Sequence, residues 1–259
     1  MLSRGVAPRV LSSDSLALVP STSVTRLGLL LLATDLRSEI DAARLLPAGE
    51  VAVHAARVAF DNPTTPENLR DMEPRLATAA ALLTPGTPLS AIYYACTSAS
   101  AVIGDEAIDR TIGASQPGIP IVTPTRAARI AFDAMSVRRV ALVTPYIEAT
   151  ALPMIAYFGS HGIEITSALC FGFEDDRTMA RISPESLVDA TLRADVSGAD
   201  AVFVSCTALP ALDVVAELEA RLGKPVVTAN QAALWMMRHF AGLTADPGGA
   251  GRLFALSPS

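Results

Sequence analysis

"YYACTSAS" (residues 93–100) and "VFVSCTALP" (residues 202–210) share one arrangement, in which an apolar run ends in a cysteine and a threonine follows it. Short apolar runs bounded by turn residues are typical of strands that are buried on both faces of a parallel sheet. Cys96 and Cys206 are about 110 positions apart. The recurrence indicates that the chain contains two copies of one structural unit.

The segments around these two stretches also correspond in pairs. "RLGLLLLATD" (26–35) matches "RRVALVTPY" (138–146), and "EVAVHAARVAF" (50–60) matches "GIEITSALCFGF" (162–173). "GIPIVTPTRAARIAF" (118–132) matches "GKPVVTANQAALWMM" (223–237). Strands are therefore predicted at 26–33, 51–58, 90–95, 119–123, 138–144, 163–169, 200–205 and 225–228, with alanine-rich helices between them.

This pattern predicts an α/β fold with two pseudo-symmetric domains, each a four-stranded parallel sheet flanked by helices. We expect the first domain to cover residues 26–135 and the second 136–230, with a helix at 231–242 packing back on the first. Residues 1–25 carry the polar clusters "SSDS" and "STS" without the apolar core of a signal peptide, and we expect them to form a flexible arm.

Composition excludes several classes of protein. The 259-residue chain has a net charge of −6 and a pI near 5.1, which argues against a nucleic-acid partner. Its longest apolar run, "LGLLLLA" (27–33), is far shorter than the ~20 residues of a membrane span. Three cysteines, an odd number, favour a reducing compartment, so a cytoplasmic location is predicted. His54, His161 and His239 are scattered, and neither metal-binding spacings nor glycine-rich nucleotide loops occur.

Both repeated cysteines follow strands that belong to parallel sheets. Ligands of such sheets bind outside the carboxyl ends of the strands, so Cys96 and Cys206 are predicted to face one interdomain cleft. A helix starting after each cysteine would lower the pKa of its thiol. The hydroxyls of Thr97, Ser98 and Thr207 could bind a carboxylate, although the same residues also serve as caps. Cys170 has no counterpart in the first half and is interpreted as a small buried side chain.

With the segment "ALVTPYIEA" (141–149), the two cysteine motifs resemble the aspartate/glutamate racemase superfamily, in particular its maleate isomerase and arylmalonate decarboxylase branch. The resemblance spans about residues 26–240. It implies an isomerase or racemase without cofactor or metal, usually a homodimer, with Cys96 and Cys206 acting on opposite sides of a small carboxylate. It also implies a substrate contact by Tyr146. Apart from the resemblance, the hydroxyls and backbone N–H groups after the two cysteines predict that Thr97, Ser98, Thr207 and Ala208 complete the binding site.

Two positions depart from the pattern of the maleate isomerases. Asp35 in "LLATDLRSE" (31–39) and either Asp175 or Asp176 in "GFEDDRTMARISPESL" (172–187) stand where those enzymes carry asparagine. Asp35 and Asp176 are predicted to bind the substrate. Carboxylates there would repel a dicarboxylate, so a substrate with a cationic nitrogen is expected. "DNPTTPENL" (61–69) and "EDDRTMARISPE" (174–185) resemble a subgroup associated with ectoine and hydroxyectoine utilisation.

Several functions remain open at this point. They are cis–trans isomerisation, inversion at an α-carbon as in aspartate/glutamate-type racemases, decarboxylation, and carboxylate binding by a regulatory protein that is not an enzyme. The superfamily's decarboxylases keep only the second cysteine, and this chain has both. Asn62 and Thr64, in the loop after the second strand, and Asn230, after the last strand, are further candidates for the cleft.

Overall fold

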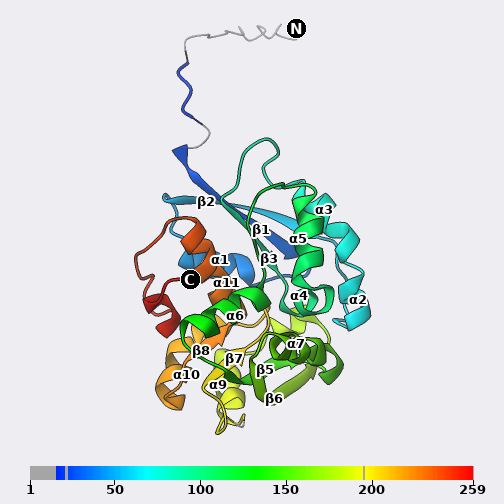
Figure 1. The fold of residues 1–259 in the computed structure, drawn as a ribbon, viewed down its shortest axis with the longest axis vertical. Coiled ribbons are helices and arrows are strands. Elements are labelled where there is room, and N and C mark those ends of the chain that lie inside the picture. Colours follow the sequence, from blue (N-terminus) through cyan, green and yellow to red (C-terminus); the bar gives the residue numbers. More distant parts are fainter. Residues whose placement is uncertain (1–15, 21–22, 195, 259) are drawn as a thin grey trace, which may run out of the picture.

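Two parallel sheets organise the chain, as the computed structural model of residues 16–20, 23–194 and 196–258 shows (Figure 1). The first sheet contains β1 (Thr25–Leu32), β2 (Val51–Val58), β3 (Ala91–Ala95) and β4 (Ile121–Val122), in the order β2-β1-β3-β4. The second contains β5 (Arg139–Tyr146), β6 (Glu164–Phe173), β7 (Ala201–Val204) and β8 (Val226–Thr228), in the order β6-β5-β7-β8. The equivalent orders confirm the predicted duplicated α/β fold.

The leucines of β1 explain why the first sheet is buried on both faces. Successive side chains of a strand point to opposite faces. Leu27, Leu29 and Leu31 belong to the larger hydrophobic core, which continues into the second half of the chain. Leu30 and Leu32 belong to a separate core on the other face. Such a continuous apolar strand therefore fixes the sheet as the middle layer between helices.

Helices connect the strands of each half. In the first half they are α1 (Ser38–Leu45), α2 (Pro66–Arg70), α3 (Glu73–Ala80), α4 (Thr97–Ile103), α5 (Asp105–Gly113) and α6 (Pro124–Ala134). In the second they are α7 (Glu148–Ser160), α8 (Asp176–Met179), α9 (Pro184–Leu192), α10 (Val215–Leu222) and α11 (Ala229–Phe240), with 3-10 turns at Ala211–Asp213 and Arg252–Ala255. Among the described residues, no helix is long and apolar enough to cross a membrane.

The helix after the last strand of each half starts in the same way. Thr123 caps α6 by accepting a bond from the Arg126 N–H, and Thr228 caps α11 by accepting one from the Gln231 N–H. Gln231 returns a bond to the Thr228 N–H and completes a capping box. The helix predicted at 231–242 thus begins earlier, at Ala229. It packs against α1, α6 and β3, all elements of the first half.

Local differences from the predicted elements have physical causes. β4 keeps only Ile121 and Val122, because Pro120 has no N–H to donate to a ladder. The sequence after Cys206 forms a 3-10 turn first, and α10 begins only at Val215, so the helix expected directly after this cysteine is absent. Most of the predicted arm, residues 1–15 and 21–22, lies outside the described residues.

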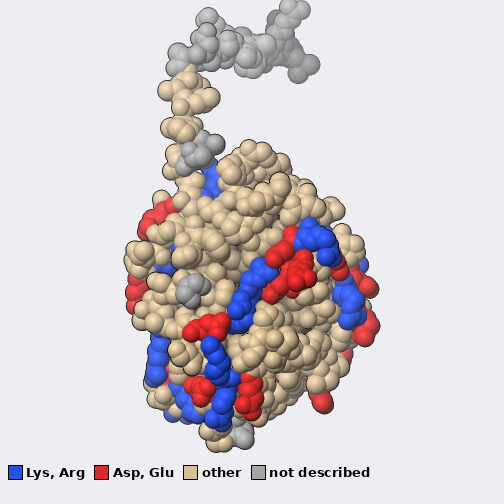
Figure 2. Space-filling model, viewed as in Figure 1, with Lys and Arg blue, Asp and Glu red and all other residues tan. Residues whose placement is uncertain are grey.

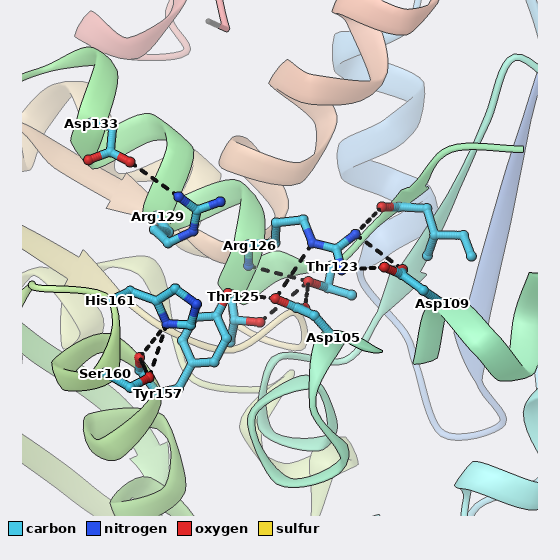
Figure 3. A network of polar contacts seen from close by, with 11 residues as sticks. Asp105, Asp109, Thr123, Thr125, Arg126, Arg129, Asp133, Tyr157, Ser160 and His161 are labelled. Carbon is cyan, nitrogen blue, oxygen red and sulfur yellow. Dashed lines mark hydrogen bonds and ion pairs between the residues drawn. The ribbon is translucent and has the colours of Figure 1, made fainter. Parts of the chain in front are cut away.

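A polar network joins the two halves beside the carboxyl end of β4 (Figure 3). The Tyr157 hydroxyl of α7 donates to Asp105 Oδ2 at the start of α5 at 2.7 Å, and the Thr123 hydroxyl donates to Asp105 Oδ1 at 2.7 Å. Arg126 pairs with Asp109 at 2.7 Å. On the face of the molecule shown in Figure 2, charged side chains of both signs gather in bands, and wide areas between the bands carry no charge. The halves are therefore held together by specific polar contacts as well as by the shared core.

Tyr157→Phe should destabilise the protein by about 1–2 kcal/mol, because it removes the hydroxyl that donates to a carboxylate across the junction. Urea unfolding followed by circular dichroism would measure the change. Thr244→Val, which removes an exposed hydroxyl outside this network, is the control and should change stability by less than ~0.5 kcal/mol. Equal effects of the two substitutions would contradict the importance of this contact.

Candidate active site

The carboxyl ends of the two sheets meet at a small closed cavity. Its lining consists of Leu32, Asp35, Ala95, Cys96, Ser98, Tyr146, Asp176, Cys206, Thr207 and Ala208. The volume open to the centre of a water molecule is ≈ 10 Å³, close to the space that one water requires. The molecule is therefore closed around this site, and any larger ligand requires it to open.

Cys96 reaches the cavity from the carboxyl end of β3, directly before α4. It is the N-cap residue, and its Sγ accepts a bond from the Ala99 N–H at 3.4 Å and lies 3.6 Å from the Ser98 hydroxyl. Its side chain is 4% exposed. Burial raises the pKa of this thiol to about 12, and the nearby carboxylate of Asp176 adds to the rise. The two donors act in the opposite direction and do not offset burial.

Cys206 reaches the cavity from the carboxyl end of β7, where the backbone is strained. Its φ of 116° falls in a region that residues other than glycine rarely adopt, and such strain concentrates at functional sites. Its Sγ accepts a bond from the Ala208 N–H at 3.3 Å, and it also has a hydrogen bond with Tyr146. Burial, followed by the charge of Asp176, raises the pKa of this thiol far above its usual range.

The expectation that helix N-termini lower the pKa of both thiols is wrong for this closed molecule. Only Cys96 precedes an α-helix, and there burial outweighs the helix. A thiol deprived of water loses the solvation that stabilises its thiolate. Both thiols are thus protonated at neutral pH while the cavity is closed, and activation requires a change in their surroundings.

The two carboxylates of the site have different partners. Asp35 Oδ1 accepts bonds from the N–H groups of Arg37 and Ser38 at 2.8 and 2.9 Å, and Oδ2 accepts one from the Ser38 hydroxyl at 2.7 Å. Among the described residues, the Asp176 carboxylate accepts bonds only from the hydroxyls of Thr34, at 2.8 Å, and Thr64, at 3.3 Å. Burial is the main cause that raises the pKa of both carboxyl groups.

The structure separates Asp175 from Asp176. Asp175 accepts bonds from Asn62 at 3.0 Å and from Arg177, so its carboxylate faces the loop and the surface. Asp176 lines the cavity. The Thr64 N–H donates to the Glu174 carbonyl at 2.7 Å, so the loops carrying these residues join the two halves beside the site. Asn62 and Thr64 therefore support the site without lining it.

Asn230 holds the chain that follows Cys206. Its amide donates to the Thr207 carbonyl and to Asp41 Oδ2, both at 2.9 Å, and its Oδ1 accepts from the Tyr93 hydroxyl at 2.8 Å. The only signal for this role in the sequence is an amide side chain just after the last strand. Thr207 lines the cavity, and its hydroxyl donates to the Ala95 carbonyl across the halves at 3.3 Å.

One predicted binding residue, Thr97, does not line the cavity. It is fully buried, and its hydroxyl has no hydrogen-bond partner in the part of the chain that the structure describes. Leu32 and Ala95 do line it and were not predicted, since apolar residues at strand ends carry no chemical signal in the sequence. Among the described residues, no cluster of His, Cys, Asp and Glu could hold a metal ion.

A larger hollow, of ≈ 470 Å³ by the same measure, lies along β4, α6 and α11. Its lining is largely apolar, and its charged side chains, Arg126 and Asp109, are bonded to each other. Nothing in this lining is a nucleophile. The chemistry of the molecule is therefore concentrated in the smaller cavity.

Fold and site define a two-domain α/β protein with a pair of thiols in one cavity. The chain belongs to the arylmalonate decarboxylase family, whose sequence profile matches residues 37–254. It is 36% identical over 141 residues to the arylmalonate decarboxylase of Bordetella bronchiseptica, covering 53% of this chain and 58% of that protein. It is 25% identical over 246 residues to a maleate isomerase of Pseudomonas putida, covering 92% and 95% of the two chains.

Solved structures agree with this assignment. A mutant of the Nocardia farcinica maleate cis-trans isomerase with a covalently bound succinylcysteine intermediate matches with a TM-score of 0.81 and 25% identity, over 89% of this chain and 98% of that one. A double mutant of arylmalonate decarboxylase in its liganded form matches with a TM-score of 0.80 and 27% identity, over 89% and 99%. The relatives in these comparisons are thus maleate isomerases and arylmalonate decarboxylases.

Alkylation should reveal the protonated state of the buried thiols. At pH 7.5 without ligand, we expect iodoacetamide to modify half-buried Cys170 before Cys96 and Cys206, because burial suppresses their thiolates. Peptide mapping by mass spectrometry would give the three rates, and the unfolded chain in guanidinium, where the three should be similar, is the control. Labelling of Cys96 or Cys206 as fast as a free thiol would contradict the closed state.

Proposed function

We propose that the chain is an isomerase that acts without a cofactor on a small carboxylate, through Cys96 and Cys206. The observation that carries this proposal is that two thiols, from corresponding ends of β3 and β7, line the same cavity. A structural role would explain one buried cysteine, but it gives no reason for a second at the equivalent place. Opposed acid and base groups are what a proton transfer or an addition to a double bond requires.

In the cis–trans reaction, the Cys96 thiolate adds to one carbon of the double bond and forms a C–S bond. The Cys206 thiol gives its proton to the neighbouring carbon and becomes a thiolate. After rotation about the new single bond, Cys206 takes a proton back, the C–S bond breaks, and the trans product leaves. Cys96 is again a thiolate and Cys206 a thiol, so atoms and charges balance over the cycle.

The substrate carboxylate would lie beside the polar groups of the lining. Ser98, next to Cys96, and the Tyr146 hydroxyl, next to Cys206, are positioned to donate to it, together with backbone N–H groups around Thr207 and Ala208. Donors held in place before the reaction stabilise charge that develops on the carboxylate. Thr97 contributes its backbone at the start of α4.

Access to the cavity requires the halves to separate. We propose that residues 26–135 and 136–230 act as two domains, with 231–242 associated with the first, and that the contacts of Asn62 and Thr64 with residues 174–176 open. Opening readmits water, and the donors around Cys96 can then favour its thiolate. Closure around the substrate would exclude water again.

The relatives support cis–trans isomerisation above inversion. Maleate isomerases match along most of this chain, and the Nocardia farcinica structure holds a covalent cysteine adduct, as an addition mechanism requires. A substrate derived from ectoine, a homodimer and a cytoplasmic location stay predictions of the sequence.

Decarboxylation is the second candidate, because the 36% identity to an arylmalonate decarboxylase exceeds the identity to the maleate isomerases. It needs one proton donor, which Cys206 could provide. Carbon dioxide release from phenylmalonate would favour this function, whereas a change of substrate geometry without loss of mass would favour isomerisation.

Replacing either thiol by alanine should lower turnover by about 10²–10⁴-fold, because each positioned proton transfer or nucleophile contributes about that much. The rates of Cys96→Ala and Cys206→Ala would be measured by proton NMR on a panel of unsaturated and amino carboxylates. Cys170→Ala is the matched control and should keep full turnover. Full activity in both active-site variants would falsify the mechanism.

Trapping should distinguish the two isomerase reactions. In Cys206→Ser, addition to a double bond should leave a substrate-sized mass increase on the peptide that contains Cys96, because the return step is slowed. Inversion at an α-carbon should instead give deuterium incorporation from D2O and no adduct. Intact-protein mass spectrometry and NMR on the same sample would read both outcomes.

A further inference from the structure

We propose, on the basis of the isomerase function above, that the substrate carries a cationic amino group as well as its carboxylate, and that Asp176 is the counter-ion of that group. Two observations support this proposal. They are the hydrogen-bond and ion-pair partners of the Asp35 and Asp176 carboxylates, and the absence of positively charged side chains from the cavity lining. The counter-ion role makes Asp176 a specificity-determining residue. Asp35, which the sequence placed beside it, has a structural role instead.

The cavity lining contains side chains that can carry a negative charge and none that can carry a positive one. Asp35, Asp176, both thiols and Tyr146 can each become negative, while no lysine, arginine or histidine is among the lining residues. Asp176 is 7% exposed, so little water reaches its carboxylate. A buried charge without a partner is strongly disfavoured, and a bound cation relieves this. A dicarboxylate would add two negative charges to the same space.

The hydrogen bonds show which carboxylate lacks compensation. Asp35 accepts three bonds, two of them from backbone N–H groups at the start of α1, and Arg57 contributes a favourable positive charge. Its oxygens are thus occupied by donors of Arg37 and Ser38, where α1 begins. Among the described residues, no backbone N–H donates to the Asp176 carboxylate and no cationic side chain forms an ion pair with it.

Even the two hydroxyl bonds of Asp176 are incomplete. Thr34 donates to Oδ2 at 2.8 Å, a firm bond. Thr64 lies 3.3 Å from Oδ1 and also 3.1 Å from Asn62 Oδ1, so its single hydrogen is shared between two acceptors. Oδ1 therefore keeps the capacity to accept a bond from a ligand. An ammonium group has three donors and would supply both that bond and the missing charge.

A cation at Asp176 would also affect both cysteines. After burial itself, the carboxylate of Asp176 is the largest cause that raises the pKa of the Cys96 and Cys206 thiols. Neutralising it favours formation of a thiolate at the moment when the substrate arrives. Substrate binding and activation of the nucleophile are thereby coupled through one side chain.

An alternative role for Asp176 makes a different prediction. A protonated Asp176 could donate a hydrogen bond to a second carboxylate of the substrate, and Asn at this position would then do the same through its amide. In that case Asp176→Asn should leave binding of a dicarboxylate unchanged, and the relative affinities for a dicarboxylate and for an amino carboxylate should stay the same. The counter-ion role requires this substitution to invert the preference, from the amino carboxylate to the dicarboxylate.

Two saturated compounds of similar length test the proposal by titration calorimetry at pH 7.5, because neither can undergo addition. They are 4-aminobutanoate, with one ammonium and one carboxylate, and succinate, with two carboxylates. The wild-type protein should bind 4-aminobutanoate more tightly. Asp176→Asn should weaken that binding roughly 30-fold or more, the usual cost of removing one partner of a buried charge pair, and should strengthen binding of succinate.

Asp175→Asn is the matched control and should keep the wild-type preference, since Asp175 lies outside the cavity lining and Asn can still cap α8. Tighter binding of succinate than of 4-aminobutanoate by the wild type, or no detectable binding of 4-aminobutanoate, would overturn the proposal. Loss of preference in Asp35→Asn with none in Asp176→Asn would overturn the choice of Asp176. Should Asp176→Asn fail to fold, Asp176→Ser serves in its place.

Thermal melting provides a readout that needs no ligand. Burial raises the pKa of Asp176, so its protonated form favours the folded state and this contribution is lost as pH rises above the usual range of a carboxyl group. Asp176→Asn should therefore melt at a higher temperature than wild type at pH 7, with the difference shrinking towards pH 4. An equal or lower melting temperature at pH 7 would oppose an uncompensated carboxylate.

Turnover separates this inference from the isomerase function. Maleate and cis-4-aminobut-2-enoate differ only in the group that would face Asp176. Isomerisation of maleate alone by the wild type would support the function and oppose the inference. Binding of 4-aminobutanoate that depends on Asp176, with no isomerisation of any compound, would support the inference and oppose the function.

Discussion

The geometry of parallel strands is the constraint on which the rest of this molecule depends. A side chain that follows such a strand lies at the carboxyl edge of its sheet, whatever the sequence beyond it. Because the two halves have equivalent strand orders, β3 and β7 are equivalent central strands, and the residues after them line one cavity. Cys96 and Cys206 meet in space because they occupy the same place in two copies of one unit.

Electrostatics then limits what the cavity can do at rest. Two thiols, a phenol and two carboxylates lie in a space with room for about one water, and burial disfavours a negative charge on each of them. In the closed molecule both thiols therefore stay protonated and are poor nucleophiles. Formation of a thiolate on either cysteine therefore depends on a change in burial or in the nearby charge of Asp176.

The sequence was sufficient for the fold and for the placement of both cysteines at equivalent strand ends, because both depend on local signals. Apolar runs mark the strands, and the repeated Cys-Thr pair marks their ends. It was not sufficient for partners that come from distant segments. The hydroxyls of Thr34 and Thr64 on Asp176, and the amide of Asn230 on the Thr207 carbonyl, depend on contacts between halves that no spacing reveals. The pKa of the thiols likewise depends on burial, which outweighs the helix that the sequence identified after Cys96.

The last helix has a consequence for how the duplicated halves are related. α11 continues directly from β8 of the second sheet, yet it packs against α1, α6 and β3 of the first. Neither half could therefore fold alone with its apolar surfaces buried. The first half would lack α11, which packs on its sheet and helices, and the second half would expose the apolar side chains of α11 to water. The single chain thus covers one sheet with a helix that continues from the other, and this arrangement ties the two halves together.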